Sequence, residues 1–327
     1  MSGRPGRGVR RAVALLLGLA IMGALLCKVG RRDLLSAIRA ADPLGLALSL
    51  AFFVPQVALM AWRWRLIGAT VRRFSFWQSC RMVLAGSALN VVLPSKLGDL
   101  CKGLMLGDAE GRHVARGLGL AALDKLLDVA GLAAVLVVAG ALAPMPERWV
   151  RLSWAGSGAG LAALLVLMHL GRTVTVPQHK ALAPLAQGLN AALTVRGHRG
   201  RWTAVLGISA LLWACHVGQI VTFYRAIGGV APAAIPWSRV PIAIFIGLLP
   251  VTVAGIGTRD VALMVLLTPW DAEAVLVWLG LFCTFRYVVM ALLGVPAVVG
   301  LGGAEAIRAA GGEAGVASPE GTAGGPA

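Results

Sequence analysis

The chain has 327 residues, of which 58% are hydrophobic and only 13% are charged, and its mean hydropathy is +0.81. A soluble domain carries about 25% charged residues, so this composition excludes a water-soluble protein, a disordered chain and a small disulfide scaffold. The formal net charge is +16, from 30 basic and 14 acidic residues. In a polytopic membrane protein this excess lies in cytoplasmic loops, and because no zinc-finger, RNP or basic-helix pattern occurs, we expect no nucleic-acid partner.

Uncharged segments indicate where the chain crosses the membrane, since a crossing needs about 20 apolar residues. The basic residues before the first segment resemble a signal peptide, but no small-residue cleavage site follows, so we predict a retained helix. The second segment ends in the sequence WRWR at 62–65, which is typical of an interfacial belt of aromatic and basic residues. The segments expected to cross are 12–27, 44–61, 152–170, 202–224 and 274–301, and 117–142 is a further full-length helix.

The apolar segment 76–107 is interrupted. Its first part contains Asn90 and stops at Pro94, and a second short helix is expected from about Gly98. Interrupted backbone at membrane depth is tolerated only inside protein or beside water, so we predict a re-entrant hairpin. The loop 172–201 supports this topology, because its five basic residues and lack of acidic ones place it in the cytoplasm only if 76–107 turns back.

A second interrupted segment, 240–270, repeats this order. It is broken at Pro250 and around Gly255 and Gly257, and Asp260 follows the break closely. Prolines end helices and glycines allow tight turns. We therefore predict a second re-entrant hairpin.

These segments predict an all-α polytopic membrane protein with about six to eight transmembrane helices in one domain, residues 1–301. Residues 10–142 and 152–301 would form an inverted repeat whose broken tips meet near the bilayer middle, as in secondary transporters. Residues 302–327 are poor in large apolar groups and are expected to be a disordered tail. We expect a bacterial inner membrane with both termini in the cytoplasm.

Three charges lie within the predicted helix 117–142. Asp124 and Asp128 share a helix face, and Lys125 can pair with Asp128 at a spacing of three residues. A charge at a helix centre costs about 2.5–3.5 kcal/mol, so these residues need partners or a use. Two interpretations stay open: a structural ion pair, or the polar wall of a translocation cavity.

Cations near the helix breaks predict an anion site. Lys96, Lys102 and Arg259 flank breaks where backbone N–H groups are also free, whereas Arg286 lies well inside a long apolar helix. Cations combined with free N–H donors suit a phosphate. We predict that these four residues, with Asn90, bind an anionic lipid headgroup; the alternative for the two lysines is that they are ordinary loop charges.

The acidic residues beside the breaks are expected to be structural. Asp99 should cap or brace its short returning helix and pair with Lys102. Asp260 should do the same in the second hairpin, with Arg259 as its partner. The histidines show no metal-ligand spacing and no nucleotide or hydrolase motif occurs, so we expect no metal, no cofactor and no soluble catalytic domain.

Together these motifs resemble the lysylphosphatidylglycerol synthase transmembrane-region family, also called flippase-like, over roughly residues 10–300. The family usually has Glu at the positions of Asp99 and Asp260 and Arg at the position of Lys102. A lysine cannot bind a phosphate through two parallel hydrogen bonds as an arginine can. The full synthases carry a soluble aminoacyl-transferase domain, which we do not expect here, so lipid lysylation is not carried over. The resemblance rests on Arg63-Trp64, NVVLPSKLGD at 90–99 with Lys102, Asp124-Lys125, residues 250–260 and Arg286.

The resemblance and the charged residues imply a lipid translocator for an anionic phospholipid or a polyprenyl-phosphate-linked lipid. Without a nucleotide site, uphill transport would use the membrane potential or a proton gradient. One alternative is a membrane-embedded transferase acting on a polyprenyl-phosphate, with Asp99 or Asp124 as base or metal ligand. The other is an accessory subunit without its own activity, and a homodimer or a lipid-modifying partner enzyme fits either view.

Overall fold

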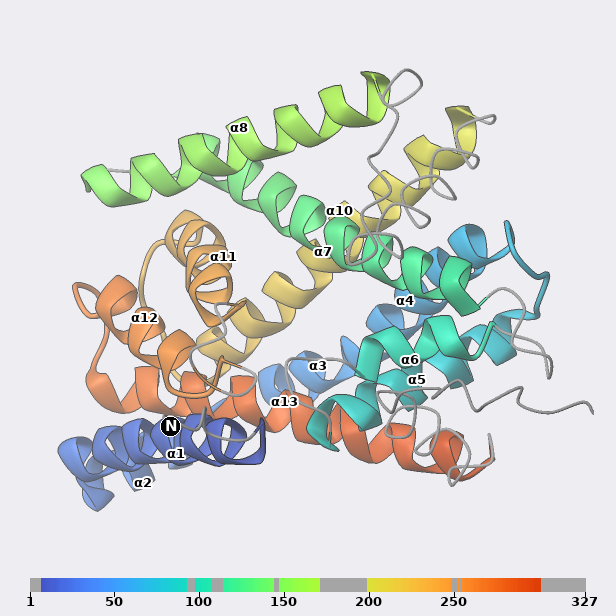
Figure 1. Ribbon diagram of the computed structural model, residues 1–327. Coiled ribbons are helices and arrows are strands. Elements are labelled where there is room, and N and C mark those ends of the chain that lie inside the picture. The colour runs from blue at the N-terminus through green and yellow to red at the C-terminus, as the bar shows by residue number, and fades with distance from the viewer. Residues whose placement is uncertain are drawn as a thin grey trace, which may run out of the picture.

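The computed structural model describes residues 7–92, 98–106, 114–143, 147–170, 199–248, 252 and 255–300, and all regular structure in these ranges is helical. Figure 1 shows the helices in chain order. They are α1 (Arg7–Val29), α2 (Arg31–Arg39), α3 (Pro43–Ala51), α4 (Phe53–Gly68), α5 (Phe76–Val92), α6 (Gly98–Leu104), α7 (Val114–Leu142), α8 (Arg148–Leu170), α10 (Arg199–Ala226), α11 (Ala234–Leu248), α12 (Thr258–Leu267) and α13 (Glu273–Gly300).

Four helical stretches within the described residues are long and apolar enough to cross a bilayer. They are Pro43–Gly68, which joins α3 and α4, Arg116–Leu142 in α7, Thr203–Ala226 in α10, and Glu273–Gly300, which is α13. The predicted crossing 152–170 lies in α8, a helix of 23 residues. The all-α membrane class is therefore confirmed, and the total of six to eight crossings stays a prediction.

Two short helical hairpins accompany the long helices. In the first, α5 packs on α6, and a Cβ atom at Gly98 would lie 2.3 Å from the backbone nitrogen of Asn90. In the second, α11 packs on α12, and a Cβ at Gly255 would lie 2.7 Å from the carbonyl oxygen of Gly247. Gly255 also has φ +74° and Gly257 has φ +90°, so the turn between α11 and α12 requires glycine at both positions.

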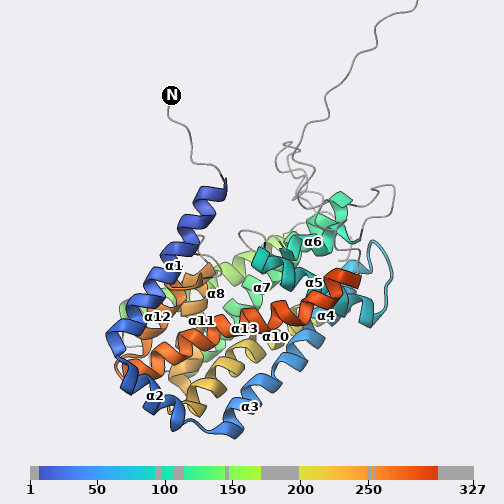
Figure 2. The ribbon, with the colours of Figure 1, turned by 90° about the horizontal axis from the view of Figure 1, so that it is seen from below.

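Each hairpin packs on two long helices, one following it in sequence and one from the other half. The helix α6 lies against α7 and α12 against α13, while α5 lies against α13 and α11 against α7. At the α5–α13 crossing, a Cβ on Gly294 would meet the carbonyl oxygen of Leu84 at 2.0 Å, so the two backbones touch. Figures 1 and 2 both place the two hairpins at opposite ends of the long helices.

The buried apolar side chains divide between the same halves. One cluster surrounds Trp64 and joins α4, α5, α6 and α7. The larger cluster surrounds Tyr224 and Phe282 and is built mainly from α10, α11, α12 and α13. The helix α10 also contacts α3, α4 and α7, so it connects the two clusters.

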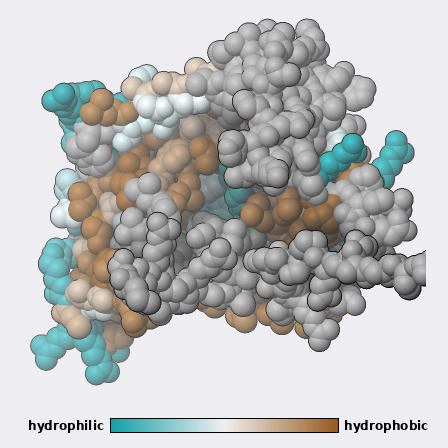
Figure 3. Space-filling view, viewed as in Figure 1, coloured by the Kyte–Doolittle hydropathy of each residue, from teal (hydrophilic) through white to brown (hydrophobic). Residues whose placement is uncertain are grey.

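The outside of the helices is apolar, as a bilayer requires. Leu292 on α13 is 65% exposed and Val138 on α7 is 63% exposed. In Figure 3, hydrophobic atoms cover most of the described part of one face, and hydrophilic atoms gather toward its margins. A soluble monomer would rarely expose so much contiguous apolar surface, so these side chains are suited to contact lipid.

Candidate functional site

A buried charged cluster joins α4, α6 and α7, and Arg63 lies at its centre. The Nε atom of Arg63 is 2.9 Å from Asp124 Oδ1, and its Nη2 atom is 2.6 Å from Asp128 Oδ1. Its Nη1 atom donates a hydrogen bond of 3.2 Å to Ser209 Oγ on α10. A single arginine of α4 therefore holds both carboxylates of α7 and contacts the central helix.

Two lysines complete the α4–α6–α7 cluster. Lys102 Nζ lies 2.7 Å from Asp124 Oδ2 and 4.0 Å from Asp99 Oδ1, while Lys125 contacts Asp99 and lies 3.2 Å from Asp128 Oδ2. The predicted pairs of Lys125 with Asp128 and of Asp99 with Lys102 are confirmed, although the shorter contact of Lys102 is to Asp124. Three cations face three carboxylates, so this cluster is electrically balanced.

The structure corrects the prediction that residues 62–65 form an interfacial belt. Trp62 is 55% exposed, but the side chain of Arg63 is only 1% exposed and Trp64 is fully buried. The ring of Trp64 lies 5.1 Å from Lys102 Nζ, inside the charged cluster. The sequence held one signal of this: Asp124, Lys125 and Asp128 carry a net negative charge inside the membrane, which requires a cation from elsewhere.

The second charged site lies where α12 meets α13. Arg259 Nη2 is 2.7 Å from Asp260 Oδ1 and also donates to the carbonyl of Gly280 at 3.4 Å and to Thr284 Oγ1 at 3.2 Å. Asp260 Oδ2 accepts a hydrogen bond of 2.8 Å from the backbone nitrogen of Gly257, which caps α12. The predicted pairing and capping role of Asp260 are therefore confirmed.

Arg286 contacts a histidine rather than a carboxylate. Its Nη2 atom lies 2.7 Å from Nδ1 of His216 on α10. Because a guanidinium can only donate, Nδ1 must accept, which requires a neutral imidazole with its proton on Nε2. Among the described residues the buried Nε atom of Arg286 has no hydrogen-bond partner, while the Arg286 side chain also contacts Cys283 on α13. The sequence indicates a hydrogen bond between helices for His216 but does not identify Arg286 as its partner.

Counting the described residues, the charge at this second site is not balanced. Arg259 and Arg286 contribute two positive charges, and Asp260 contributes one negative charge, while His216 is neutral in this arrangement. A cation without a counter-ion is costly inside a membrane protein and marks a functional site. Arg259 and Arg286 provide hydrogen-bond donors for an anion, whose negative charge would balance the site.

The remaining predicted site residues fall into two groups. Asn90 Oδ1 accepts a 3.1 Å hydrogen bond from the backbone nitrogen of Asp99, so Asn90 caps the start of α6. Lys96, Pro94 and Pro250 lie outside the described residues. Within the described ranges, no three His, Cys, Asp or Glu side chains are grouped so that they could hold a metal ion.

One face of α10 connects the two charged sites. Ser209, His216 and Phe223 are spaced seven residues apart, which places them along one stripe with a rise of about 10 Å between neighbours. Ser209 receives the hydrogen bond from Arg63, and His216 that from Arg286. The balanced cluster and the positively charged site therefore lie along the same helix face.

Comparison with known proteins gives a family for this arrangement. The sequence profile described as "Lysylphosphatidylglycerol synthase TM region" matches residues 11–294, which include both hairpins and both charged sites. No curated protein sequence matches the chain. The matched region covers most of the chain and agrees with the all-helical, lipid-facing structure, and the protein therefore belongs to the lysylphosphatidylglycerol synthase transmembrane-region family.

Proposed function

We propose that the protein moves an anionic lipid, either a phospholipid or a polyprenyl-phosphate-linked lipid, between the leaflets of a bacterial inner membrane. The observation that carries this proposal is the charge of Arg286, for which the described part of the chain supplies no carboxylate and whose buried Nε atom has no hydrogen-bond partner there. A lipid phosphate has the charge and the acceptor oxygens to satisfy it. Arg259 lies close enough to Arg286 for the two charges to interact.

The arrangement of the halves supports an alternating-access route. The hairpins α5–α6 and α11–α12 lie at opposite ends of the long helices, and each packs on the long helix of the other half. This is the order expected for inverted repeats of residues 10–142 and 152–301, with a substrate site at their interface. The segment 172–201, with five basic residues and no acidic one in the sequence, supports cytoplasmic termini.

The two charged sites have different roles in this proposal. The balanced cluster of Arg63, Lys102 and the carboxylates needs no ligand and fixes α4, α6 and α7 together. The site at Arg286 takes the headgroup, and the stripe on α10 leads from one site to the other. The engagement of Asp99 and Asp124 with cations gives no support to either residue as the base of a transferase.

Lipid movement in proteoliposomes tests the proposal. Phosphatidylglycerol with a fluorescent headgroup label is followed by the loss of fluorescence when an impermeant quencher is added outside. Arg286→Gln should slow translocation at least tenfold, because it removes the charge that holds the phosphate. Arg81→Gln, on the exposed face of α5, is the matched control and should retain the wild-type rate. Equal rates in the two variants would remove Arg286 from the mechanism.

A further inference from the structure

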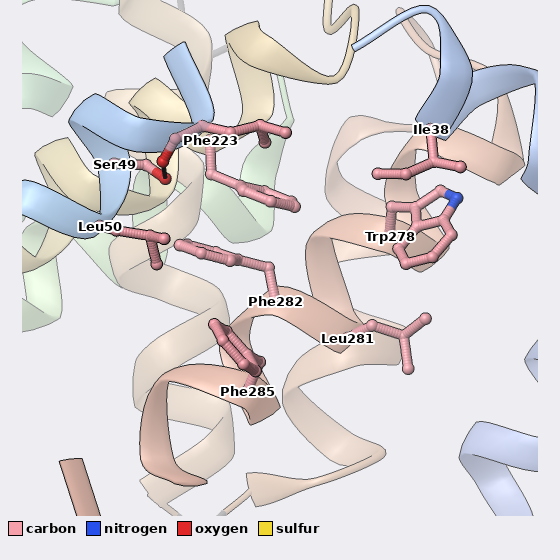
Figure 4. Close-up of a pocket in the computed structure, with 9 residues that line it drawn as sticks. Ile38, Ser49, Leu50, Phe223, Trp278, Leu281, Phe282 and Phe285 are labelled. Carbon is pink, nitrogen blue, oxygen red and sulfur yellow. Dashed lines mark hydrogen bonds between the residues drawn. The ribbon is translucent and has the colours of Figure 1, made fainter. Parts of the chain in front are cut away.

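An apolar cavity lies next to the Arg286 site. Its volume is about 330 Å³, and helices α2, α3, α10 and α13 form its walls. Figure 4 shows its aromatic side chains, with Phe223 and Phe282 facing each other. These two rings stack with centroids 3.7 Å apart and planes 3° apart. The side chains that define the cavity include Ile38, Leu50, Phe223, Trp278, Phe282 and Phe285.

The cavity and the cation share two helices. On α13, Phe282 precedes Arg286 by four residues, so the ring lies on the same face about 6 Å along the axis. On α10, Phe223 follows His216 by seven residues and lies on the same stripe. The stacked rings of the cavity therefore lie on the same side of the Arg286–His216 contact along both helices.

The cavity opens at side chains that are exposed to the surroundings. Leu50 is 42% exposed and Phe285 is 47% exposed, whereas Phe282 at the inner wall is only 5% exposed. The helix α2 borders the opening through Ile38 and has no buried residue. It also carries three arginines and is strongly amphipathic, as expected for a helix at the membrane interface.

We propose that this cavity holds one acyl or prenyl chain of the anionic lipid whose phosphate binds at Arg286. This inference rests on the proposed function, and it adds the place of the hydrophobic tail. A cation beside an apolar cavity matches an amphipathic anion, with charge at one end and hydrocarbon at the other. An α-helix of a partner, about 10 Å in diameter, does not fit a volume of 330 Å³, whereas a single chain does.

Photolabelling of the full chain in proteoliposomes tests the chain site. The probe is phosphatidylglycerol with a diazirine near the end of one acyl chain, and the labelled peptides are identified by mass spectrometry. We expect labelling of α13 and α10 around Phe282 and Phe223. Unlabelled phosphatidylglycerol should compete at least fivefold better than phosphatidylcholine. Equal competition by the two lipids would mean contact with bulk membrane lipid only and would overturn the proposal.

Matched variants on α3 separate the cavity from the general lipid surface. Leu50→Trp fills the opening and should reduce labelling at least fivefold, while Leu50→Ala widens it and should keep labelling. Leu48→Trp is the control, because Leu48 is 52% exposed on the same helix and does not line the cavity. Equal labelling in the two tryptophan variants would overturn the chain site.

The charge variant distinguishes failure of the chain site from failure of the function. If translocation depends on Arg286 but labelling ignores Leu50→Trp, only the chain site is wrong. If the wild-type protein does not translocate lipid, the proposed function itself is wrong, whatever the labelling. If Arg286→Gln translocates at the wild-type rate, Arg286 is not the phosphate site of the mechanism. Thermal unfolding of each variant identifies one that has failed to fold. If Leu50→Trp fails to fold, the competition between phosphatidylglycerol and phosphatidylcholine in the wild-type protein decides the case.

Discussion

Arg63 and Arg286 both lie in long apolar helices, but their partners differ in charge. Arg63 contacts the carboxylates of Asp124 and Asp128, whereas Arg286 contacts the neutral ring of His216. A buried pair that loses one member leaves an unpaired charge, which is strongly destabilising. Removing a cation that has no carboxylate partner should lower the stability of the fold much less. The two arginines should therefore respond differently to the same substitution.

Replacing Arg63 should destabilise the protein. Arg63→Gln leaves three carboxylates facing two lysines, and we expect a loss on the order of 3 kcal/mol in the free energy of unfolding. Thermal unfolding in detergent measures this, with Arg65→Gln as the control because Arg65 is exposed on the same helix. Adding Asp128→Asn to Arg63→Gln should recover part of the loss. An unfolding temperature of Arg63→Gln equal to that of Arg65→Gln would contradict a structural role.

The residue contacts that could be predicted from the sequence are the local ones. The pairs Lys125–Asp128 and Arg259–Asp260 follow from helical spacing or adjacency, which fix the neighbours before the fold is known. The contact of Arg63 with Asp128 joins residues 65 positions apart, and that of Arg286 with His216 joins residues 70 apart. Such partners depend on how helices pack, which a single sequence does not specify.

At the scale of elements, the glycine positions explain how short helices pack so closely. A Cβ on Gly103 of α6 would lie 2.3 Å from the carbonyl oxygen of Gly117 on α7. Small residues at such crossings let two backbones touch, which is a common way for membrane helices to associate. The breaks at the hairpins could be predicted from glycine and proline, but these glycine crossings within continuous helices could not.

An ion pair connects the turn before α8 to α11. Arg239 is buried, and its Nη2 atom lies 3.0 Å from Glu147 Oε2 and 3.2 Å from Oε1. The Arg239 guanidinium also lies 4.8 Å from the ring of Trp270. Partial burial acts to raise the pKa of Glu147, but the hydrogen bond and charge of Arg239 outweigh it, so this pKa lies below its usual value.

Glu147→Gln should weaken this connection in a pH-dependent way. Because the pKa of Glu147 is lowered in the folded state, its ionised carboxylate stabilises the fold at pH values above the ordinary pKa of roughly 4.3. This stabilisation is lost as the pH falls through the lower pKa of the folded protein. At pH 7 we expect the variant to lose roughly 1 kcal/mol, the size typical of a partly exposed pair. Thermal unfolding of both proteins between pH 7 and pH 3 measures the difference, which should shrink toward the acid end. A difference that is constant with pH would exclude the charge as its cause.

At the scale of the whole molecule, helices from the two halves of the sequence contact one another. The order of a long helix, a broken hairpin and another long helix could be predicted in both halves from the position of apolar and helix-breaking residues. The packing of α5 on α13 and of α11 on α7 could not, because each joins segments more than 90 residues apart. These contacts join each hairpin to a long helix from the other half of the chain.

An inverted repeat predicts that the hairpins start on opposite sides of the membrane. Single cysteines are introduced at Arg73, before α5, and at Val230, before α11, after the five native cysteines are replaced. Both positions are exposed, and Val230 is 70% exposed. An impermeant maleimide added to spheroplasts should label Val230→Cys at once and Arg73→Cys only after permeabilisation. Labelling of both from one side would exclude the inverted arrangement.

The claim that an uncompensated cation inside the membrane holds an anionic lipid is tested most directly by native mass spectrometry of the purified protein. Wild type and Arg81→Gln should each retain an anionic lipid at collision energies that remove phosphatidylcholine. Arg286→Gln should lose this bound lipid while keeping its fold. An anionic lipid retained equally by all three proteins would contradict the account.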